Sequence, residues 1–331
     1  MDKFYYSVYG PFIEKFIDLK RSLGYKYIGG TGSLARFDKF VANRDESEVR
    51  ISKELAEEWG AKNPNESDPN RYIRIEIIRQ FSLFLCQLGY PSYVPKLPKF
   101  NSKYTPYIFS KEQIINLFTA CDQLKPAVCH RKSLIFIIPT LFRLLYGTGM
   151  RTSEALSLLS SDVNLEDNYL ILRNCKNGKD RLIPIASSLA EVCREYLKYR
   201  NHYAQLNPYV SDRFFISPKG SPCIHIEVYA WFRKVLYNAG ISHGGKGHGP
   251  RLHDIRHSFS VHSLAAMAEA GMDLYYSLPV LSTYLGHQSL GATDKYVRLT
   301  KEMYPSIIEN ANKLCPYLFP EILNLNNNET N

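Results

Sequence analysis

Two pairs of polar side chains in the second half of the sequence could bind a phosphate. Arg151 and Glu154 follow the run Gly147-Thr148-Gly149, and His253 and Arg256 follow the loop GGKGHGPRL. A spacing of three residues places both members of a pair on the same face of a helix. An arginine guanidinium presents its N–H groups as a planar fork that fits two phosphate oxygens. Each pair alone also has a plainer explanation, such as a surface ion pair between Arg151 and Glu154.

A metal site is the other chemistry that these residues suggest. His253 and His257 flank Asp254 in a pattern similar to the zinc-binding helix H-E-x-x-H, which would place both histidines on one face. The catalytic base of such helices is a glutamate, and no third ligand follows here at a familiar spacing. The sequence therefore disfavours metal-dependent hydrolysis, and a buried, hydrogen-bonded histidine is the plainer interpretation of His257.

Four segments together are more specific than either pair. The segment YGTGMRTSEALSL, a lysine-bearing hairpin, LHDIRHSF and YLGHQSLGATDKYVR occur in this order. This arrangement resembles the tyrosine recombinase family of phage integrases and Xer-type enzymes, from about Thr105 to Phe319. The resemblance implies a mainly α-helical fold with a small β-sheet (α+β). It also implies an enzyme that cleaves and rejoins DNA at specific sites.

The resemblance implies a role for each matching residue. Arg151 and Arg256 would be the two catalytic arginines that hold the scissile phosphate. Glu154 would brace Arg151 from behind. His253 would assist proton transfer or orient the phosphate, and His287 would donate a hydrogen bond to it.

Tyr296 falls at the position of the family's nucleophile. Any one of the 24 tyrosines is most often a packing residue, so this assignment depends on the motif. Its attack would give a 3′-phosphotyrosyl bond and a free 5′ hydroxyl, without any cofactor or metal. Lys176, in the hairpin CKNGKDRLIPI, would protonate the leaving 5′ oxygen. Lys179 stays open as the alternative, because a shift of one residue changes the face of a hairpin.

Two stretches near the nucleophile depart from the family pattern or extend it. The segment AEAGMDLYYSLPVLSTYLGH is several residues longer than usual, so the approach to His287 and Tyr296 is expected to differ. Thr152 also stands where an apolar residue is common. After Tyr296, the segment MYPSIIENANKLCPYLF is expected to form a tail helix, which in the family often docks on a neighbouring protomer; packing on its own domain is the alternative.

A helical domain over residues 1–95 is expected to precede the catalytic part. Apolar residues at helical spacing predict its first two helices: Phe12, Phe16, Leu19 and Leu23, then Leu34, Phe37 and Val41. Ser52 is predicted to cap a third helix, and a fourth runs from about Arg71 to Gly89. One face of the fourth helix carries Arg71, Arg74 and Arg79, which either contact DNA or face solvent. In general character this domain matches the family's core-binding domain.

The proline- and lysine-rich stretch PSYVPKLPKFNSKYTP predicts a linker, placed at 96–106, before a catalytic domain over 107–319 and a polar tail over 320–331. Ser110 and Gln113 predict a capping box. An apolar helix from Leu134 to about Tyr146 is expected to kink at Pro139. Runs of β-branched and apolar residues around Asn177-Gly178 predict a β-hairpin. Three further helices are expected near 189–203, 226–239 and 253–270.

Composition sets the class of protein. The chain has 331 residues, 45% of them hydrophobic, which suits two folded domains. Its formal net charge of +9 favours a polyanionic partner. No run approaches the roughly 20 apolar residues of a membrane span, and the start lacks the pattern of a secretion signal, so a cytoplasmic location is expected. The seven cysteines are scattered without a C-x-x-C pair, which argues against disulfides or a zinc knuckle.

The sequence therefore predicts an integrase-like or transposase-like recombinase. Its expected partners are double-stranded DNA with specific recombination sites and three further copies of itself, as a homotetramer on paired sites, without cofactor or membrane. Two alternatives stay open. A type IB topoisomerase shares the chemistry, but the helical first domain and the tail argue for recombination. A non-catalytic DNA-binding relative is disfavoured because every motif position is filled.

Overall fold

The structure is a computed structural model of the 331-residue chain. It describes residues 5–44, 46–100, 105–125, 134–175, 178, 180–205, 209–245 and 248–297. The chain divides into two compact units, Met1–Tyr104 and Thr105–Asn331, and this division falls within the predicted linker. In the described part of the chain, no helix combines the length and the hydropathy that crossing a membrane requires.

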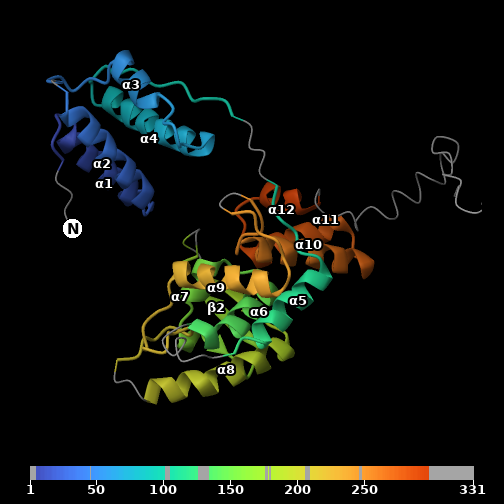
Figure 1. The fold of residues 1–331 in the computed structure, drawn as a ribbon. Coiled ribbons are helices and arrows are strands. Elements are labelled where there is room, and N and C mark those ends of the chain that lie inside the picture. Colours follow the sequence, from blue (N-terminus) through green and yellow to red (C-terminus); the bar gives the residue numbers. More distant parts are fainter. Residues whose placement is uncertain are drawn as a thin grey trace, which may run out of the picture. The chain divides into compact units, whose positions relative to one another are not determined.

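Among its described residues, the first unit contains four helices: α1 (Gly10–Ser22), α2 (Ile28–Ala42), α3 (Lys53–Gly60) and α4 (Asp68–Gln87). The long helix α4 packs against the other three, and α1 and α2 lie side by side beneath it (Figure 1). Aromatic rings fill the core, where Phe37 and Phe81 are completely buried. Ser52 caps α3 as predicted, because its hydroxyl accepts a hydrogen bond from the Leu55 N–H at 3.0 Å.

Only part of the apolar set that predicts the first helix lies in its core. Phe16 is buried, but Leu19 and Leu23 are 41% and 62% exposed. The residues that α1 buries beside Phe16 are Ile13 and Ile17. Two apolar stripes run along this helix at the same helical period. The stripe with more contacts to α2 and α4 becomes the core, which a period alone does not determine.

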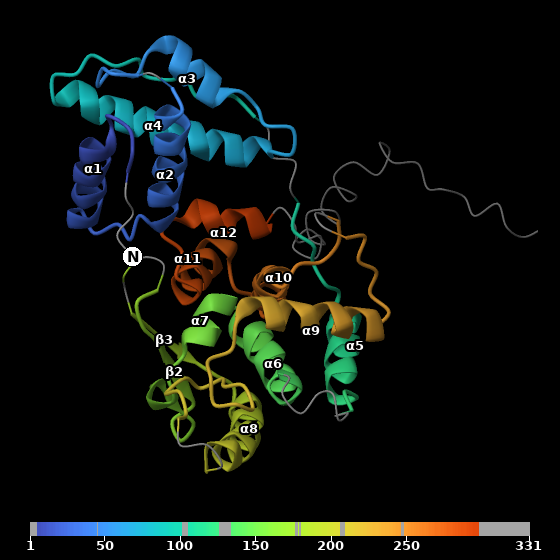
Figure 2. The ribbon, with the colours of Figure 1, turned by 60° about the vertical axis from the view of Figure 1, so that its left-hand side comes forward.

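The second unit contains eight helices among its described residues: α5 (Lys111–Asp122), α6 (Ile138–Thr148), α7 (Thr152–Ser157), α8 (Ser187–Gln205), α9 (His225–Asn238), α10 (Asp254–Glu269), α11 (Leu274–Leu285) and α12 (Leu290–Val297). Helices α10, α11 and α12 pack together, and α10 also packs on α6 (Figure 2). The expected helices near 189–203, 226–239 and 253–270 correspond to α8, α9 and α10. The mainly α-helical fold with a small sheet is confirmed.

The sheet has three antiparallel strands in the order β1 (Val163–Asn164), β2 (Tyr169–Leu172) and β3 (Arg181–Pro184). The predicted hairpin is formed by β2 and β3, with Ile171 opposite Leu182. The lysines of its tip, Lys176 and Lys179, lie outside the described residues.

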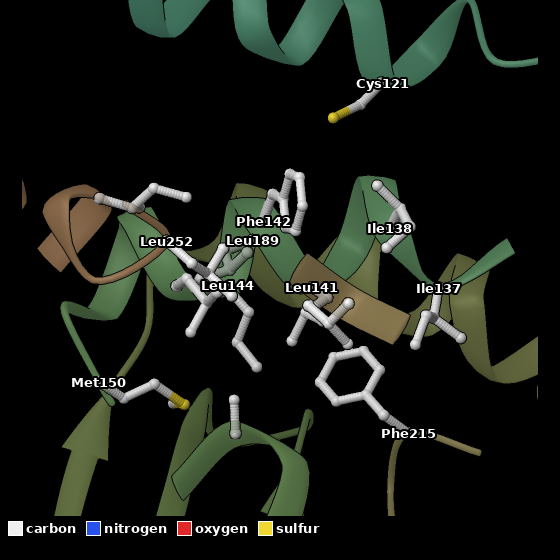
Figure 3. Close-up of a cluster of buried hydrophobic side chains, with 14 of the residues drawn as sticks. Cys121, Ile137, Ile138, Leu141, Phe142, Leu144, Met150, Leu189, Phe215 and Leu252 are labelled. Carbon is white, nitrogen blue, oxygen red and sulfur yellow. The ribbon is translucent and has the colours of Figure 1, made fainter. Parts of the chain in front are cut away.

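Helix α6 is the centre of the hydrophobic core of the second unit. Its residues Leu141, Phe142 and Leu144 are completely buried and point into a cluster that includes Met150 (Figure 3). The predicted kink at Pro139 was wrong. The chain forms a short 3₁₀ turn, η2 (Leu134–Phe136), and α6 then begins with Pro139 in its first turn. Proline fits that position because the first N–H groups of a helix have no intrahelical partner.

The predicted capping box of α5 is confirmed. The Ser110 hydroxyl accepts from the Gln113 N–H at 3.1 Å, and the Gln113 side chain accepts from the Ser110 N–H at 3.1 Å. Just before it, the Phe109 N–H donates to the Ser258 hydroxyl at 2.8 Å. The start of the second unit is thereby fixed to α10, the helix that carries Arg256.

Candidate active site

Arg151 occupies the N-cap position of α7 and is held by Glu154. The Arg151 backbone N–H donates to Glu154 Oε2 at 2.9 Å, and Arg151 Nη1 donates to Glu154 Oε1 at 2.7 Å. The Glu154 side chain is only 8% exposed, whereas that of Arg151 is 22% exposed. A buried carboxylate thus orients a guanidinium whose other side reaches solvent.

A second arginine, which no motif of the sequence marks, binds the same carboxylate. Arg181 on β3 donates through Nη2 to Glu154 Oε2 at 2.8 Å, and its Nη1 lies 3.3 Å from Oε1. Burial raises the pKa of Glu154, but the hydrogen bond from the Arg151 N–H and the charges of Arg181 and Arg151 outweigh it, so this pKa is lowered. Glu154 is therefore an anion between two cations, and it joins the hairpin to α7.

Arg256 lies on α10, is 3% exposed, and connects three segments. Its Nη1 donates to the Gly149 carbonyl at 2.8 Å, and its Nη2 donates to the Leu285 carbonyl at 2.8 Å. The same Nη2 lies 2.9 Å from His287 Nε2. Burial, followed by the charge of Arg151, lowers the pKa of Arg256 to about 10, so the group remains a cation at neutral pH.

His287 follows the C-terminus of α11, where Gly286 adopts a left-handed conformation with φ of 65°. Arginine has no acceptor, so His287 Nε2 must accept from Arg256, and a neutral ring then carries its proton on Nδ1. Nδ1 lies 2.8 Å from the Thr293 hydroxyl and donates to it in this tautomer. The predicted hydrogen bond from His287 to a phosphate would have to replace one of these two partners.

Tyr296 lies on α12, is 4% exposed, and contacts two histidines. Its hydroxyl is 3.0 Å from His257 Nδ1. Its ring stacks on that of His287, with centroids 6.2 Å apart. His257 in turn packs edge-on against His253, with centroids 4.8 Å apart. The sequence favours a buried, hydrogen-bonded histidine at His257, and the partner of its Nδ1 is the Tyr296 hydroxyl.

The three histidines share an electrostatic environment that disfavours their protonation. Burial, together with the charges of Arg256 and other cations, lowers the pKa of His257 and of His287 to about 4. Burial and His257 also lower the pKa of His253, but this side chain is exposed at the surface, so solvent screens part of the effect. His257 and His287 are therefore neutral at physiological pH.

Within the described ranges, no group of three or more His, Cys, Asp or Glu side chains could hold a metal ion. In the HDIRH segment, the nearest carboxylate oxygen to His257 Nε2 belongs to Asp254, at 4.0 Å, and Asp254 accepts from the Arg251 N–H at 2.7 Å. His257 Nδ1 faces the Tyr296 hydroxyl instead of a third ligand. The alternative of a zinc helix thus gains no support from this geometry.

The arginines predicted to contact DNA lie on α4 of the first unit. Arg71 Nε donates to the Gly60 carbonyl at 2.8 Å, and Arg79 Nη1 donates to the Pro95 carbonyl at 2.9 Å. Every nitrogen of the Arg74 guanidinium has a protein partner, among them Glu66 at 2.6 Å and the Ala61 carbonyl at 2.9 Å. The Arg74 side chain is 10% exposed, a geometry that favours a structural role for it.

The chain is similar to several known proteins. The profile described as the phage integrase family matches residues 108–303. The chain is 31% identical over 301 residues to the provisionally named integrase/recombinase y4rB of Sinorhizobium fredii, covering 90% of this chain and 95% of that protein. It is 32% identical over 220 residues to tyrosine recombinase XerA of Pyrococcus horikoshii, covering 66% and 64% of the two chains.

Two solved structures share the fold. The recombinase XerH, in a complex with its palindromic difH substrate, superposes with a TM-score of 0.65 at 20% identity, over 91% of this chain and 83% of that chain. A lambda integrase dimer on a core site has a TM-score of 0.59 at 14% identity, over 86% and 94%. The chain belongs to the phage integrase family, the tyrosine recombinases. Its class of activity is site-specific recombination.

Proposed function

We propose that this recombinase breaks DNA through a covalent bond between Tyr296 and a 3′ phosphate. The observation that supports this most is the meeting of three motifs at one place. The Tyr296 ring stacks on His287, and His287 accepts from Arg256, although these residues come from α12, the end of α11 and α10. A phenol, an imidazole and a guanidinium in contact provide a nucleophile beside groups that stabilise phosphate charge.

In this proposal the two arginines bind the nonbridging oxygens of the scissile phosphate. Arg151 offers the exposed side of its guanidinium, and Glu154 keeps that guanidinium in one orientation. Arg256 would exchange its contact with His287 for a phosphate oxygen. Charge on those oxygens grows in the transition state, where fixed cations stabilise it more than they do the ground state.

Proton transfer to the leaving 5′ oxygen is assigned to the hairpin. Arg181, the first residue of β3, is bound to Glu154, and in the sequence Lys176 and Lys179 precede it by five and two residues. Lys176 is the proposed general acid, with Lys179 as the alternative. His253, which is exposed at the N-terminus of α10, would orient the phosphate or assist this transfer.

The proposed partner is double-stranded DNA with specific recombination sites. The formal net charge of +9 suits a polyanion, and Arg71 and Arg79 of the first unit remain candidates for phosphate contacts. XerH is described in a complex with its difH substrate, and the lambda integrase dimer is bound to a core site. By analogy we propose that this chain pairs two sites as a homotetramer and acts as an integrase or transposase.

Tyr296→Phe tests the proposal directly. It removes one oxygen and preserves the ring, so we expect normal DNA binding but no covalent adduct. A suicide substrate nicked beside the scissile phosphate would trap the 3′-phosphotyrosyl species on a denaturing gel. Tyr146→Phe is the matched control, because the Tyr146 hydroxyl is also bound to a histidine of α10, His262, at 2.8 Å. An undiminished adduct from Tyr296→Phe would overturn the assignment.

The same assay separates recombination from relaxation of supercoils. A recombinase needs two matching sites and yields exchanged strands, whereas a type IB topoisomerase would relax any supercoiled plasmid. We expect products only with paired sites.

A further inference from the structure

The His257 side chain is hydrogen-bonded to the Tyr296 hydroxyl, with 3.0 Å between Nδ1 and the phenolic oxygen. It lies on α10, four residues and about one helical turn after His253. The His257 side chain is 15% exposed, and Tyr296 is 4% exposed, so the contact is sheltered from water. The roles taken from the family motifs leave this histidine unused.

The protonation state of His257 makes it an acceptor toward Tyr296. Burial, Arg251, Arg256 and other cations lower the pKa of His257 to about 4, so its ring is neutral at pH 7 and has one donor and one acceptor nitrogen. Nε2 lies 4.0 Å from Asp254 Oδ1, which favours the proton on Nε2. The lone pair of Nδ1 then faces the Tyr296 hydroxyl.

We propose that His257 is the general base that accepts the Tyr296 proton during cleavage and returns it during rejoining. The inference rests on the proposed nucleophilic role of Tyr296. In the forward step the phenolic oxygen forms a bond to phosphorus, its proton moves to His257 Nδ1, and the bond from phosphorus to the 5′ oxygen breaks. That oxygen takes a proton from the general acid of the hairpin. In the reverse step the imidazolium returns its proton to the departing phenol.

The imidazolium would be stabilised only after DNA arrives. The charged and titratable groups around His257 come from four places: Arg251 before α10, His253, Asp254 and Arg256 around its first turn, His287 after α11, and Lys295 with Tyr296 on α12. Cations outnumber Asp254 in this set. A bound phosphate supplies the missing negative charge, so proton transfer to His257 becomes favourable when a substrate is present.

His253 is the competing base. Its ring contacts that of His257, but His253 is exposed at the surface, whereas His257 Nδ1 lies within hydrogen-bond distance of the Tyr296 hydroxyl. This geometry leaves His253 available to the phosphate.

His257→Asn is the test variant. The asparagine amide can occupy the position of Nδ1 and hold the hydroxyl, but it cannot take a proton. With enzyme saturating and a suicide substrate, we expect DNA binding to be unchanged and adduct formation near pH 7 to fall on the order of 10²-fold. Hydroxide should replace the lost base, so the variant's rate should rise about tenfold per pH unit and the defect should narrow by pH 9.

Controls distinguish a base from a packing residue. His262→Asn alters the other histidine of α10 whose Nδ1 contacts a tyrosine hydroxyl, at 2.8 Å, and should leave both the rate and its pH dependence unchanged. Replacing Tyr296 with difluorotyrosine, a more acidic phenol, should raise the rate of adduct formation more in the His257→Asn background than in the wild-type background. A defect that is independent of pH and of phenol acidity, or no defect at all, would overturn the inference.

Failure of this inference differs from failure of the proposed function. If an adduct forms, requires Tyr296 and is unaffected in His257→Asn, only the general base is wrong. If the adduct persists in Tyr296→Phe, the nucleophile itself is wrong.

Discussion

Glu154 is the residue that connects the two arginines Arg151 and Arg181. It binds Arg151 of α7 and Arg181 of β3 at once, and it is 8% exposed. A buried carboxylate that lost one of these partners would retain the cost of its own desolvation. The two arginines and Glu154 therefore act as one unit, which couples the position of the hairpin to the orientation of Arg151.

The first prediction separates the two lysines of the hairpin tip. Lys176→Ala should reduce cleavage of ordinary DNA strongly, on the order of 10²-fold or more, because the 5′ oxygen leaves without a proton. A 5′ thiolate needs no proton, so a substrate with bridging sulfur at the scissile position should largely restore its rate. Cleavage rates on the two substrates give the measurement.

Lys179→Ala is the matched control for that experiment. It removes the same charge three residues further along the chain and should show no selective rescue by sulfur. Rescue of Lys179→Ala in place of Lys176→Ala would reverse the assignment of the general acid.

The sequence marks the residues proposed for the site, but it does not reveal which distant residues contact them. Local spacing, within the segments that resemble tyrosine recombinases, marks Arg151, Glu154, Arg256 and Tyr296. The contact of Arg181 with Glu154 joins strand to helix, and the contact of His257 with Tyr296 joins α10 to α12. Such contacts depend on how distant elements pack, and the spacing of residues along one element does not contain that information.

Among the elements of the site, the turn between α6 and α7 is closely packed. Gly149 ends α6 with φ of +58°, and a Cβ there would lie 2.7 Å from Phe259 Cε1 and 2.9 Å from Leu285 Cδ2. Its carbonyl also accepts from Arg256. A side chain at this position would push α10 and α11 away from the segment that carries Arg151.

We predict that Gly149→Ala destabilises the protein by about 2–4 kcal/mol, through backbone strain and overpacking, and reduces cleavage further. Denaturant unfolding and the adduct assay would measure the two effects. Gly240→Ala is the control, since Gly240 also has a positive φ of +69° but a Cβ there would have no neighbour within 4 Å. It should cost only about 1 kcal/mol. Equal losses in both variants would mean that close packing at Gly149 is unimportant.

The types of the elements were predictable, and their starting points and buried faces were less so. Capping by Ser52 and Ser110 is local chemistry, and both predictions are confirmed. Pro139 was placed in a kink because the apolar pattern runs through it, whereas the chain breaks just before it. Helix α1 has two apolar stripes, and packing against the neighbouring helices determines which of them is buried.

At the scale of the whole molecule, the buried histidines predict an acid-sensitive fold. The pKa of His257 in the folded chain, about 4, lies below its ordinary value of 6.5. The unfolded chain therefore binds more protons between these values, so stability is full above about pH 6.5 and falls as the pH drops toward 4. Urea unfolding at pH 7 and pH 4.5 should show this loss.

In His257→Asn, the decrease in unfolding free energy between pH 7 and pH 4.5 should be smaller by at most about 3 kcal/mol. The reason is that the asparagine does not bind a proton in this range. The comparison with wild type removes the contribution of the carboxylates, which titrate in the same range. An identical pH dependence in the two proteins would show that His257 keeps its ordinary affinity for protons.

A further prediction concerns assembly of the protein on paired DNA sites. The segment from Lys301 onward, which lies outside the described residues, follows Tyr296, the proposed nucleophile, and is expected from the sequence to dock on a neighbouring protomer. Removing it should spare binding to a single site but weaken complexes on paired sites, which sedimentation or gel shift would detect. Equal assembly by full-length and shortened protein would favour packing of the tail on its own domain.

Arg256 has a consequence for how inactive variants are interpreted. Because its guanidinium holds the Gly149 and Leu285 carbonyls together, an inactive Arg256→Ala protein would not distinguish a lost phosphate ligand from a collapsed scaffold. Neutralising the substrate would distinguish them. A methylphosphonate at the scissile position carries no negative charge, so a variant that lacks only a counter-charge should cleave it, whereas one with a displaced α11 should cleave neither substrate. Cleavage of chemically altered DNA can therefore show whether loss of Arg256 removes a counter-charge or displaces α11.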